Sequence, residues 1–136
     1  MTAENPAPAS IEALRAEVLA EIRPQVASAA PMVSKLAASF AYGEIWPRPQ
    51  LSQRDRSIAT LAALVTLSCT EELRLHTLRG LSNGLTKEEI GEILTQLLPY
   101  VGFPLVVSAA TKISDLIERA DLGEPTVGPA AVVERG

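Results

Sequence analysis

The sequence has a single cysteine and a single histidine, which limits the metal centres and redox sites it can build. One thiol cannot form a disulfide within the chain, and this fits a reducing, cytoplasmic setting. One imidazole and one thiol cannot complete a zinc site without distant carboxylates, so we expect no metal. A glycine-rich phosphate-binding loop is also missing.

Basic clusters and long apolar runs are equally scarce. The formal net charge is -4 and no basic run stands out, which argues against a nucleic-acid partner. No run of about 18 uninterrupted apolar residues exists, so we expect no membrane span. The first ten residues, MTAENPAPAS, have no basic region leading into an apolar one and do not resemble a signal peptide.

Alanine and leucine, both good helix formers, dominate a chain that is 47% hydrophobic and only 4% aromatic. A length of 136 residues suits one domain. We therefore predict one all-α domain over residues 10–121, a flexible N-terminus over 1–9 and a loose tail over 122–136. The apolar excess suggests that part of the surface is buried in an oligomer.

Proline, glycine and capping residues predict where the helices begin and end. Ser10 is a candidate N-cap for the first helix, and Pro24 and Pro31 should each interrupt the pattern before them. We expect a second helix over 32–42 that ends at Gly43, followed by a loop over 43–52.

The second half of the chain predicts four more helical segments and no strand. The helix over 53–68 is apolar nearly all round, so we expect it at the centre of the core. A helix over 70–81 follows, and Thr86 with Glu89 forms a capping box for the next one. Pro99 should kink or stop that helix, and a last helix should reach about residue 120.

The stretch CTEELRLHTLRG, residues 69–80, contains both the cysteine and the histidine. At about 100° per residue, Glu72, His76 and Arg79 fall within about 80° of Cys69 on one helix face. A carboxylate one turn from an imidazole can fix its tautomer or raise its pKa, and an arginine can hold an acidic substrate. The pattern therefore allows a proton-transfer site.

A purely structural interpretation fits the same spacing. Glu72 and His76 could be an ordinary helical i,i+4 pair, and a lone cysteine is most often a small buried apolar residue. Trp46, in its proline-rich loop, could line a pocket or anchor the core. Spacing alone does not separate these interpretations.

Four blocks in fixed order carry a resemblance to a known family: YGEIWPRPQLSQRDRS, EELRLH, SNGLTKEEI and YVGFP. Together they resemble the carboxymuconolactone decarboxylase family, the relatives of the alkylhydroperoxidase AhpD, from about Phe40 to about Leu116. The resemblance implies an all-α fold, homotrimers or homohexamers, and an enzyme that needs neither metal nor organic cofactor.

The peroxidase branch of the resembled family carries Cys-x-x-Cys-x-x-x-His. Cys69 and His76 match this pattern, but Glu72 stands where the second cysteine would be. Ser57 also stands where that branch has a glutamate. Reduction of a peroxide then needs an external thiol to close the cycle, so only a one-cysteine version remains as an alternative.

The decarboxylase branch carries Glu-Glu-Leu-Arg-x-His, which residues 71–76 match. The resemblance implies that His76, Glu72 and Cys69 lie in the catalytic site. It also implies that the substrate contacts come from the upstream block, at Tyr42, Trp46, Arg48 and Arg56.

One departure from the decarboxylases concerns the stretch after Gly-Phe-Pro, where they usually have Asn-His. This chain has Val107 and Ser108 there, so its pocket should be less polar. We therefore expect a cofactor-independent decarboxylation, isomerisation or related proton transfer on an unsaturated lactone or polyketide-like carbonyl compound. The alternatives are the one-cysteine peroxidase and a non-catalytic oligomer that binds a small ligand.

Overall fold

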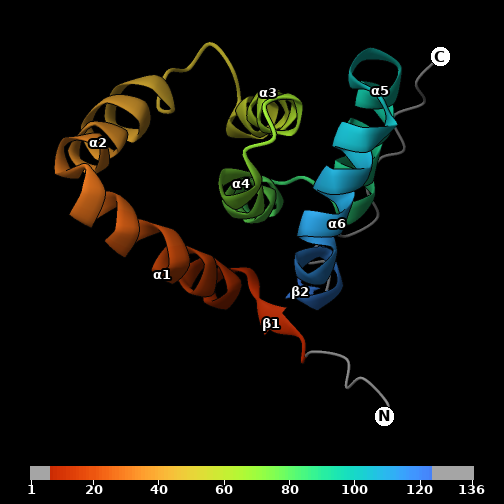
Figure 1. The fold of residues 1–136 in the computed structure, drawn as a ribbon, viewed down its shortest axis with the longest axis horizontal. Helices are drawn as coiled ribbons and strands as arrows, with labels where there is room; N and C mark the ends of the chain where they lie inside the picture. Colours follow the sequence, from red (N-terminus) through yellow and green to blue (C-terminus); the bar gives the residue numbers. More distant parts are fainter. Residues whose placement is uncertain (1–6, 124–136) are drawn as a thin grey trace.

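Residues 7–123, which the computed structural model describes, fold as a helical bundle with one very short strand pair (Figure 1). The elements in chain order are β1 (Ala9–Ser10), α1 (Ile11–Ala29), α2 (Pro31–Leu36), the π-helix η1 (Ala37–Ile45), α3 (Gln53–Thr66), α4 (Thr70–Ser82), α5 (Lys87–Val101), α6 (Phe103–Arg119) and β2 (Ala120–Asp121). The predicted all-α class is confirmed. Most of the predicted flexible N-terminus and loose tail lies outside the described residues.

Helix α4 forms the centre of the core and packs against α1, α3, α5 and α6. Its leucines Leu73, Leu75, Leu78 and Leu81 are all buried, as is Thr77. The prediction that the helix over 53–68 would be central is wrong. Much of the apolar surface of α3 is alanine. The neighbouring helices cover only one side of α3, and Ser57, Leu61 and Val65 are buried there.

Side-chain caps begin three of the helices, as the sequence predicted for Ser10 and Thr86. The Ser10 hydroxyl accepts from Ala13 N–H at 3.1 Å, and the Thr86–Glu89 capping box is complete. Such caps satisfy amide groups that the first helical turn leaves without a partner. Ser52 caps α3 in the same way.

Two prolines interrupt less than the sequence predicted. Pro24 lies inside α1, which continues to Ala29, and Pro99 lies inside α5, which continues to Val101. A proline removes one hydrogen bond to the preceding turn, and the other bonds of a packed helix can hold it together. Gly102, with φ +88°, ends α5, while Pro31 starts α2 as expected.

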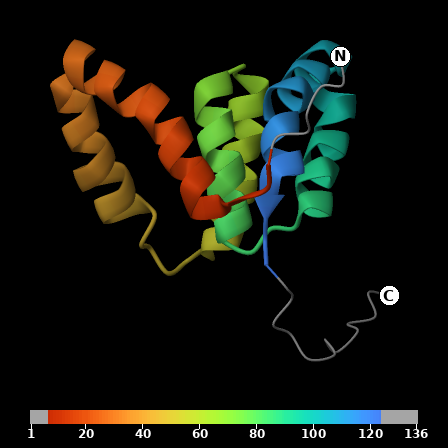
Figure 2. The ribbon, with the colours of Figure 1, turned by 90° about the horizontal axis from the view of Figure 1, so that it is seen from below.

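The segment after α2 is a π-helix that sequence periodicity did not predict. Its i→i+5 pattern is visible in the 2.9 Å bond from Trp46 N–H to Ala41 C=O, and it runs through Gly43 without ending there. Such segments are rare and often occur at functional sites. Figure 2 shows α2 and η1 folding back beside α1 at one side of the bundle.

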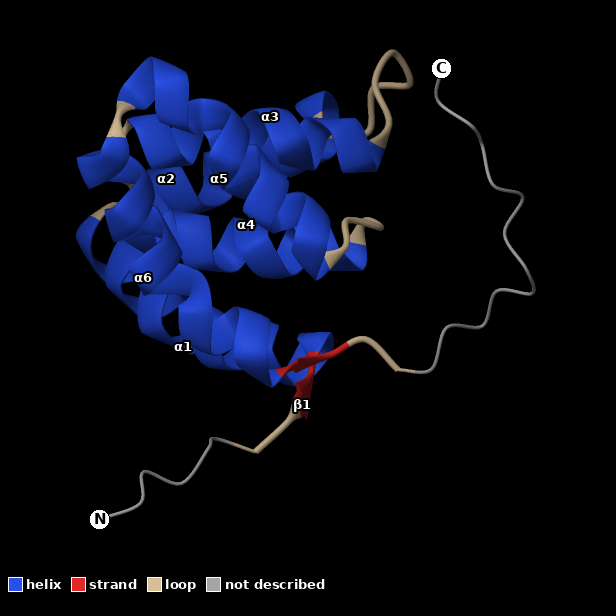
Figure 3. Ribbon diagram, turned by 90° about the vertical axis from the view of Figure 1, so that its right-hand side faces the viewer, coloured by secondary structure: helices blue, strands red, loops and turns tan. Residues whose placement is uncertain are grey.

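The residues just before α1 and just after α6 pair as two short strands, where the sequence predicted none. Ala9 pairs with Ala120 and Ser10 with Asp121 in a parallel ladder (Figure 3). Two residues per strand carry no readable alternation in the sequence, so local patterning could not predict the pair. None of the described helices is long and apolar enough to cross a membrane.

Candidate active site

His76 lies on α4 and faces two aromatic residues from the π-helix and its C-terminal end. The Tyr42 hydroxyl lies 3.3 Å from His76 Nε2. The Trp46 ring stacks on the imidazole, with centroids 5.9 Å apart and planes 14° apart. Tyr42 and Trp46 also stack on each other at 6.0 Å. Three of the predicted site residues therefore form one stacked cluster.

Glu72 completes one edge of this cluster. Its Oε2 atom lies 3.8 Å from His76 Nε2, one helical turn away, and its side chain is 47% exposed. An ionised carboxylate can only accept hydrogen bonds, so its position favours a proton on Nε2. With the proton on Nε2, the Tyr42 oxygen accepts from Nε2–H and the phenolic proton of Tyr42 is free for another acceptor, whereas the other tautomer reverses this bond.

Burial sets the protonation state of His76. Desolvation in the core, followed by the positive charge of Arg79, lowers the pKa of His76 to about 4. The sequence had suggested that Glu72 could raise this pKa, but the exposed carboxylate does not outweigh these two effects. His76 is therefore neutral near pH 7, and Nδ1 is buried without a hydrogen-bond partner among residues 7–123.

Arg79 lies against Tyr42 on the other side. Its guanidinium carbon is 4.2 Å from the centroid of the Tyr42 ring, which is cation–π geometry. Burial raises the pKa of Tyr42, and the charge of Arg79 opposes that rise. Burial also lowers the pKa of Arg79. Tyr42 is thus a neutral phenol whose ionised form has a cation beside it.

Arg48 and Arg56, predicted to contact substrate, contact each other. An Arg56 Nη donates to the Arg48 carbonyl oxygen at 2.8 Å, and the Gln53 side chain donates to the Trp46 carbonyl. These bonds from the first turn of α3 fix the loop that follows η1. Arg56 therefore helps to position Trp46, whereas the Arg48 side chain is exposed.

Cys69, like Arg48 and Arg56, is a predicted site residue whose hydrogen bond lies outside the stacked cluster. It precedes α4 as the N-cap residue with φ -85° and ψ 78°, so the helical projection from the sequence does not apply to it. Its thiol lies 3.8 Å from the Leu67 carbonyl. Ser57, at the position of the peroxidase glutamate, instead accepts from Asn83 at 3.0 Å.

Arg74 has a structural partner that explains part of the Glu-Glu-Leu-Arg-x-His pattern. Its guanidinium binds both oxygens of Asp115 on α6, at 2.6 and 2.9 Å. Leu73 is buried in the core. Two of the matched positions thus hold α4 in place, and His76 and Glu72 remain for chemistry.

Val107 and Ser108 lie on α6, away from the stacked cluster. Ser108 lines a small cavity with Thr70 and Leu73 at the start of α4, and Val107 is exposed. His76 lies further along α4. Ser108 thus lies beside the beginning of α4, and neither Val107 nor Ser108 is among the residues found in contact with His76.

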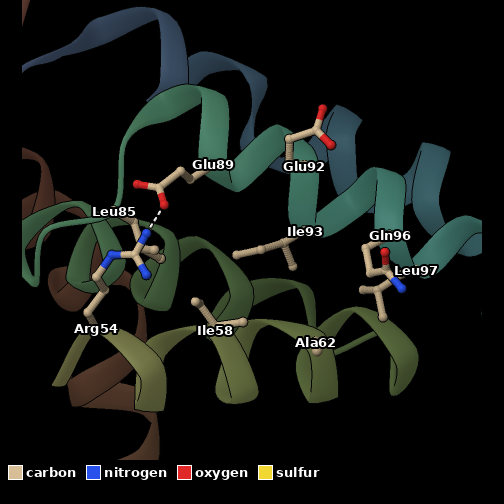
Figure 4. A pocket seen from close by; sticks show the side chains of 9 residues that line it. All are labelled: Arg54, Ile58, Ala62, Leu85, Glu89, Glu92, Ile93, Gln96 and Leu97. Atoms are coloured by element: carbon tan, nitrogen blue, oxygen red, sulfur yellow. Dashed lines mark ion pairs between the residues drawn. The ribbon is translucent and has the colours of Figure 1, made fainter. Parts of the chain in front are cut away.

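A larger cavity of about 410 Å³ lies between α3 and α5 (Figure 4). Ile58, Ala62, Ile93 and Leu97 form its apolar walls, and an ion pair between Arg54 and Glu89 stands at one end. It contains neither the imidazole nor a tyrosine. The stacked cluster is the better candidate site because it joins groups that can exchange a proton.

The described residues contain no cluster of three histidine, cysteine, aspartate or glutamate side chains placed to hold a metal ion. The groups available for chemistry are an imidazole, a phenol, a carboxylate and guanidinium groups. Sequence reasoning missed the positive charges of Arg15 and Arg23 on α1, which act on both Tyr42 and Arg79. They lie outside every matched motif, and no local signal marks them.

Residues 31–115 match the family model described as carboxymuconolactone decarboxylase family. The chain is 42% identical over 65 residues to the 4-carboxymuconolactone decarboxylase of Acinetobacter baylyi, covering 48% of each chain. It is 30% identical over 95 residues to the nitrosuccinic acid decarboxylase of Metarhizium robertsii, covering 67% of this chain and 66% of that protein. The matches thus span about half of one relative's length and just under two thirds of the other's.

Proposed function

The chain belongs to the carboxymuconolactone decarboxylase family, and we propose that it decarboxylates an acidic, unsaturated carbonyl compound without a metal or organic cofactor. The observation that carries this proposal is the contact between the Tyr42 hydroxyl and His76 Nε2. A phenol, a neutral imidazole and a carboxylate meet there in one half-buried cluster. Loss of CO2 requires groups of this kind because the carbon that loses CO2 must receive a proton.

The reaction comprises loss of CO2, stabilisation of the electron pair that is left behind, and protonation of the carbon that held the carboxylate. The bond between the carboxylate carbon and its neighbour breaks, CO2 leaves, and the electron pair stays on the neighbouring carbon. A conjugated carbonyl group delocalises that pair, and hydrogen-bond donors beside it stabilise the developing charge. The carbon then takes a proton, and the proton donor is refilled from solvent.

Tyr42 is the proton donor in this proposal. With Nε2–H directed at the phenolic oxygen, the Tyr42 proton points to the substrate, and the phenolate left behind keeps the Nε2–H bond. Arg79 over the ring also stabilises that phenolate. Glu72 and His76 form the supporting pair, since Glu72 holds the proton of the neutral imidazole on Nε2.

Trp46, Arg48 and Arg56 are proposed to form the substrate-facing rim of the site. Trp46 offers an apolar face beside the imidazole, and Arg48 is exposed at the end of the same loop. The names of the two relatives specify a lactone acid and a nitro acid. Both suit the electron-pair chemistry above, because a lactone carbonyl or a nitro group can take up negative charge.

A homo-oligomer is part of the proposal. Large apolar side chains stand exposed on α2 and η1, among them Met32, Val33, Leu36 and Phe40, which are 60%, 55%, 51% and 54% exposed. Leaving such a stripe in water is costly, and a second copy of the chain would cover it. The proposed unit is the single all-α domain of residues 10–121, assembled as a trimer or hexamer.

A thiol peroxidase with one cysteine is the second candidate function, and it depends on Cys69. The thiol is half-buried and does not contact His76. A non-catalytic oligomer that binds a hydrophobic acid is the third candidate. These functions differ in a simple readout: CO2 release, thiol-dependent loss of peroxide, or ligand binding without chemistry.

The test is CO2 release from 4-carboxymuconolactone and from nitrosuccinic acid, with His76→Ala as the control. We expect wild-type protein to release CO2 from at least one acid, and the variant to lose that activity while keeping its helical circular dichroism and its oligomeric state. Turnover by folded His76→Ala at the wild-type rate would contradict the assigned role. Loss of peroxide with an external thiol, and no CO2, would favour the second candidate.

A further inference from the structure

Several arginines of the described chain have a carboxylate partner: Arg54 pairs with Glu89, Arg74 with Asp115, and Arg119 with Glu17. Arg79, which lies against Tyr42, and Arg15 on α1 have no carboxylate within 4.0 Å among residues 7–123. A guanidinium that is half-buried without a counter-charge is costly, and such an arrangement is more frequent at functional sites.

The unpaired guanidinium groups come from two packed helices. Helix α1, which carries Arg15, packs along α4, which carries Arg79. Both side chains are half-buried, and the Nε atom of each, like those of Arg56 and Arg119, is shielded from solvent without a hydrogen-bond partner in the described part of the chain. Arg79 stacks on Tyr42 at 4.2 Å.

The positive charges of these arginines act on Tyr42 in the stacked cluster. Arg79, Arg15 and Arg23 each favour the ionised form of Tyr42 and so act against the rise in its pKa that burial causes. Arg15 and Arg23 also help to lower the pKa of Arg79, as neighbouring like charges do. Glu72 is the one carboxylate that acts on both Tyr42 and Arg79. Three positive charges thus face one negative charge, in a chain whose net charge is -4.

We propose that Arg15 of α1 and Arg79 of α4 form a binding site for a carboxylate group of the substrate, with Arg23 at its rim. A planar carboxylate can bind the guanidinium fork through both oxygens, and it would neutralise the excess positive charge. Helix α1 precedes residues 31–115, the part that matches the family model, so Arg15 and Arg23 supplement the matched motifs. The inference that the bound acid loses CO2 rests on the proposed function. The binding of an anion by Arg15 and Arg79 can be measured separately from turnover.

Succinate is a suitable probe because it is a small dicarboxylate without the unsaturation that the proposed chemistry needs. Trp46 is the only tryptophan of the chain and lies within the cluster, so its fluorescence reports on binding. We expect succinate to bind, and dimethyl succinate, which lacks the charges, to bind at least about tenfold more weakly. Arg15→Gln and Arg79→Gln should each lower succinate affinity roughly tenfold or more, as expected for lost hydrogen bonds to a charged group.

Two further variants keep the test decisive. Lys35→Gln removes one positive charge from an exposed position on α2 and should leave succinate affinity within about twofold, because an exposed charge is screened by salt. Arg15→Lys keeps the charge but loses the fork, and is the fallback if Arg15→Gln does not fold. Its affinity should fall between those of wild type and Arg15→Gln.

The outcomes separate this inference from the proposed function. If the wild type does not turn over either acid but binds succinate through Arg15 and Arg79, the proposed reaction is wrong and the anion site stands. If CO2 is released and Arg15→Gln leaves both the succinate affinity and KM at wild-type values, the anion site is wrong. Equal binding of succinate and dimethyl succinate would also overturn it.

Discussion

The hydroxyl of Tyr42 lies 3.3 Å from Nε2 of His76, although the two residues are 34 positions apart in the sequence. Tyr42 is on the π-helix η1 and His76 is on the central helix α4. The contact joins two of the four sequence blocks that carry the family resemblance, the one that begins at Tyr42 and the one that ends at His76. It also explains why the imidazole is buried, since Trp46 stacks on His76 and on Tyr42.

The low pKa of His76 predicts that acid destabilises the fold. In the unfolded chain a histidine takes up a proton below about pH 6.5, whereas folded His76 does so only below about pH 4. Between these values the unfolded state binds more protons. The free energy of unfolding should therefore fall by about 3 kcal/mol as the pH drops from 6.5 to 4.

Urea unfolding at several pH values measures this loss, and His76→Gln is the control. The variant lacks the titrating imidazole, so its stability should fall less over the same interval, by the amount assigned to His76. Since His76 is the only histidine, its ring signals in an NMR titration of the untagged protein report the pKa directly. An imidazole that titrates near pH 6.5 in the folded protein would contradict the explanation.

Glu72 and its neighbour Glu71 form a matched pair of carboxylates. Both are exposed on the first turn of α4, but only Glu72 approaches His76. Glu72→Gln should lower kcat by about tenfold, because it no longer favours the proton on Nε2, while stability changes by less than about 0.5 kcal/mol. Glu71→Gln should keep wild-type kcat. Equal rates in the two variants would remove Glu72 from the mechanism.

Cys69 is expected to be dispensable for CO2 release. Its thiol lies before the first turn of α4 and contacts the Leu67 carbonyl. Cys69→Ser should therefore keep kcat within about twofold of wild type for the acid that is turned over, because no proton or charge passes through the thiol. A large loss of CO2 release in a folded Cys69→Ser protein would restore a catalytic role for the cysteine.

Local sequence signals predicted much of the fold because they act within one or two turns. The caps at Ser10 and Thr86 and the break at Pro31 are all short-range effects. The predicted interruptions at Pro24 and Pro99 do not occur, because the surrounding helical bonds and packing hold α1 and α5 together. The π-helix was missed because the residues of η1 carry no pattern that distinguishes it from an α-helix.

The candidate site was predictable only in part. Matched motifs pointed to His76, Glu72, Tyr42 and Trp46, and the structure places these four together. Helical spacing and the family resemblance both predicted Cys69 in the site, but the helix starts one residue later and the helical projection does not apply to Cys69. Arg15 could not be predicted, since its role depends on the packing of α1 against α4, a tertiary contact with no local signal.

The most direct test of the account compares the two tyrosines of the chain. Tyr42→Phe keeps the ring that stacks on Trp46 and lies under Arg79, but removes the hydroxyl. Tyr100→Phe makes the same change at a side chain that is 78% exposed. With Tyr42 as the proton donor, Tyr42→Phe should lower kcat for CO2 release by about 100-fold or more, and Tyr100→Phe should leave it unchanged. A Tyr42→Phe protein that releases CO2 at the wild-type rate would contradict the account.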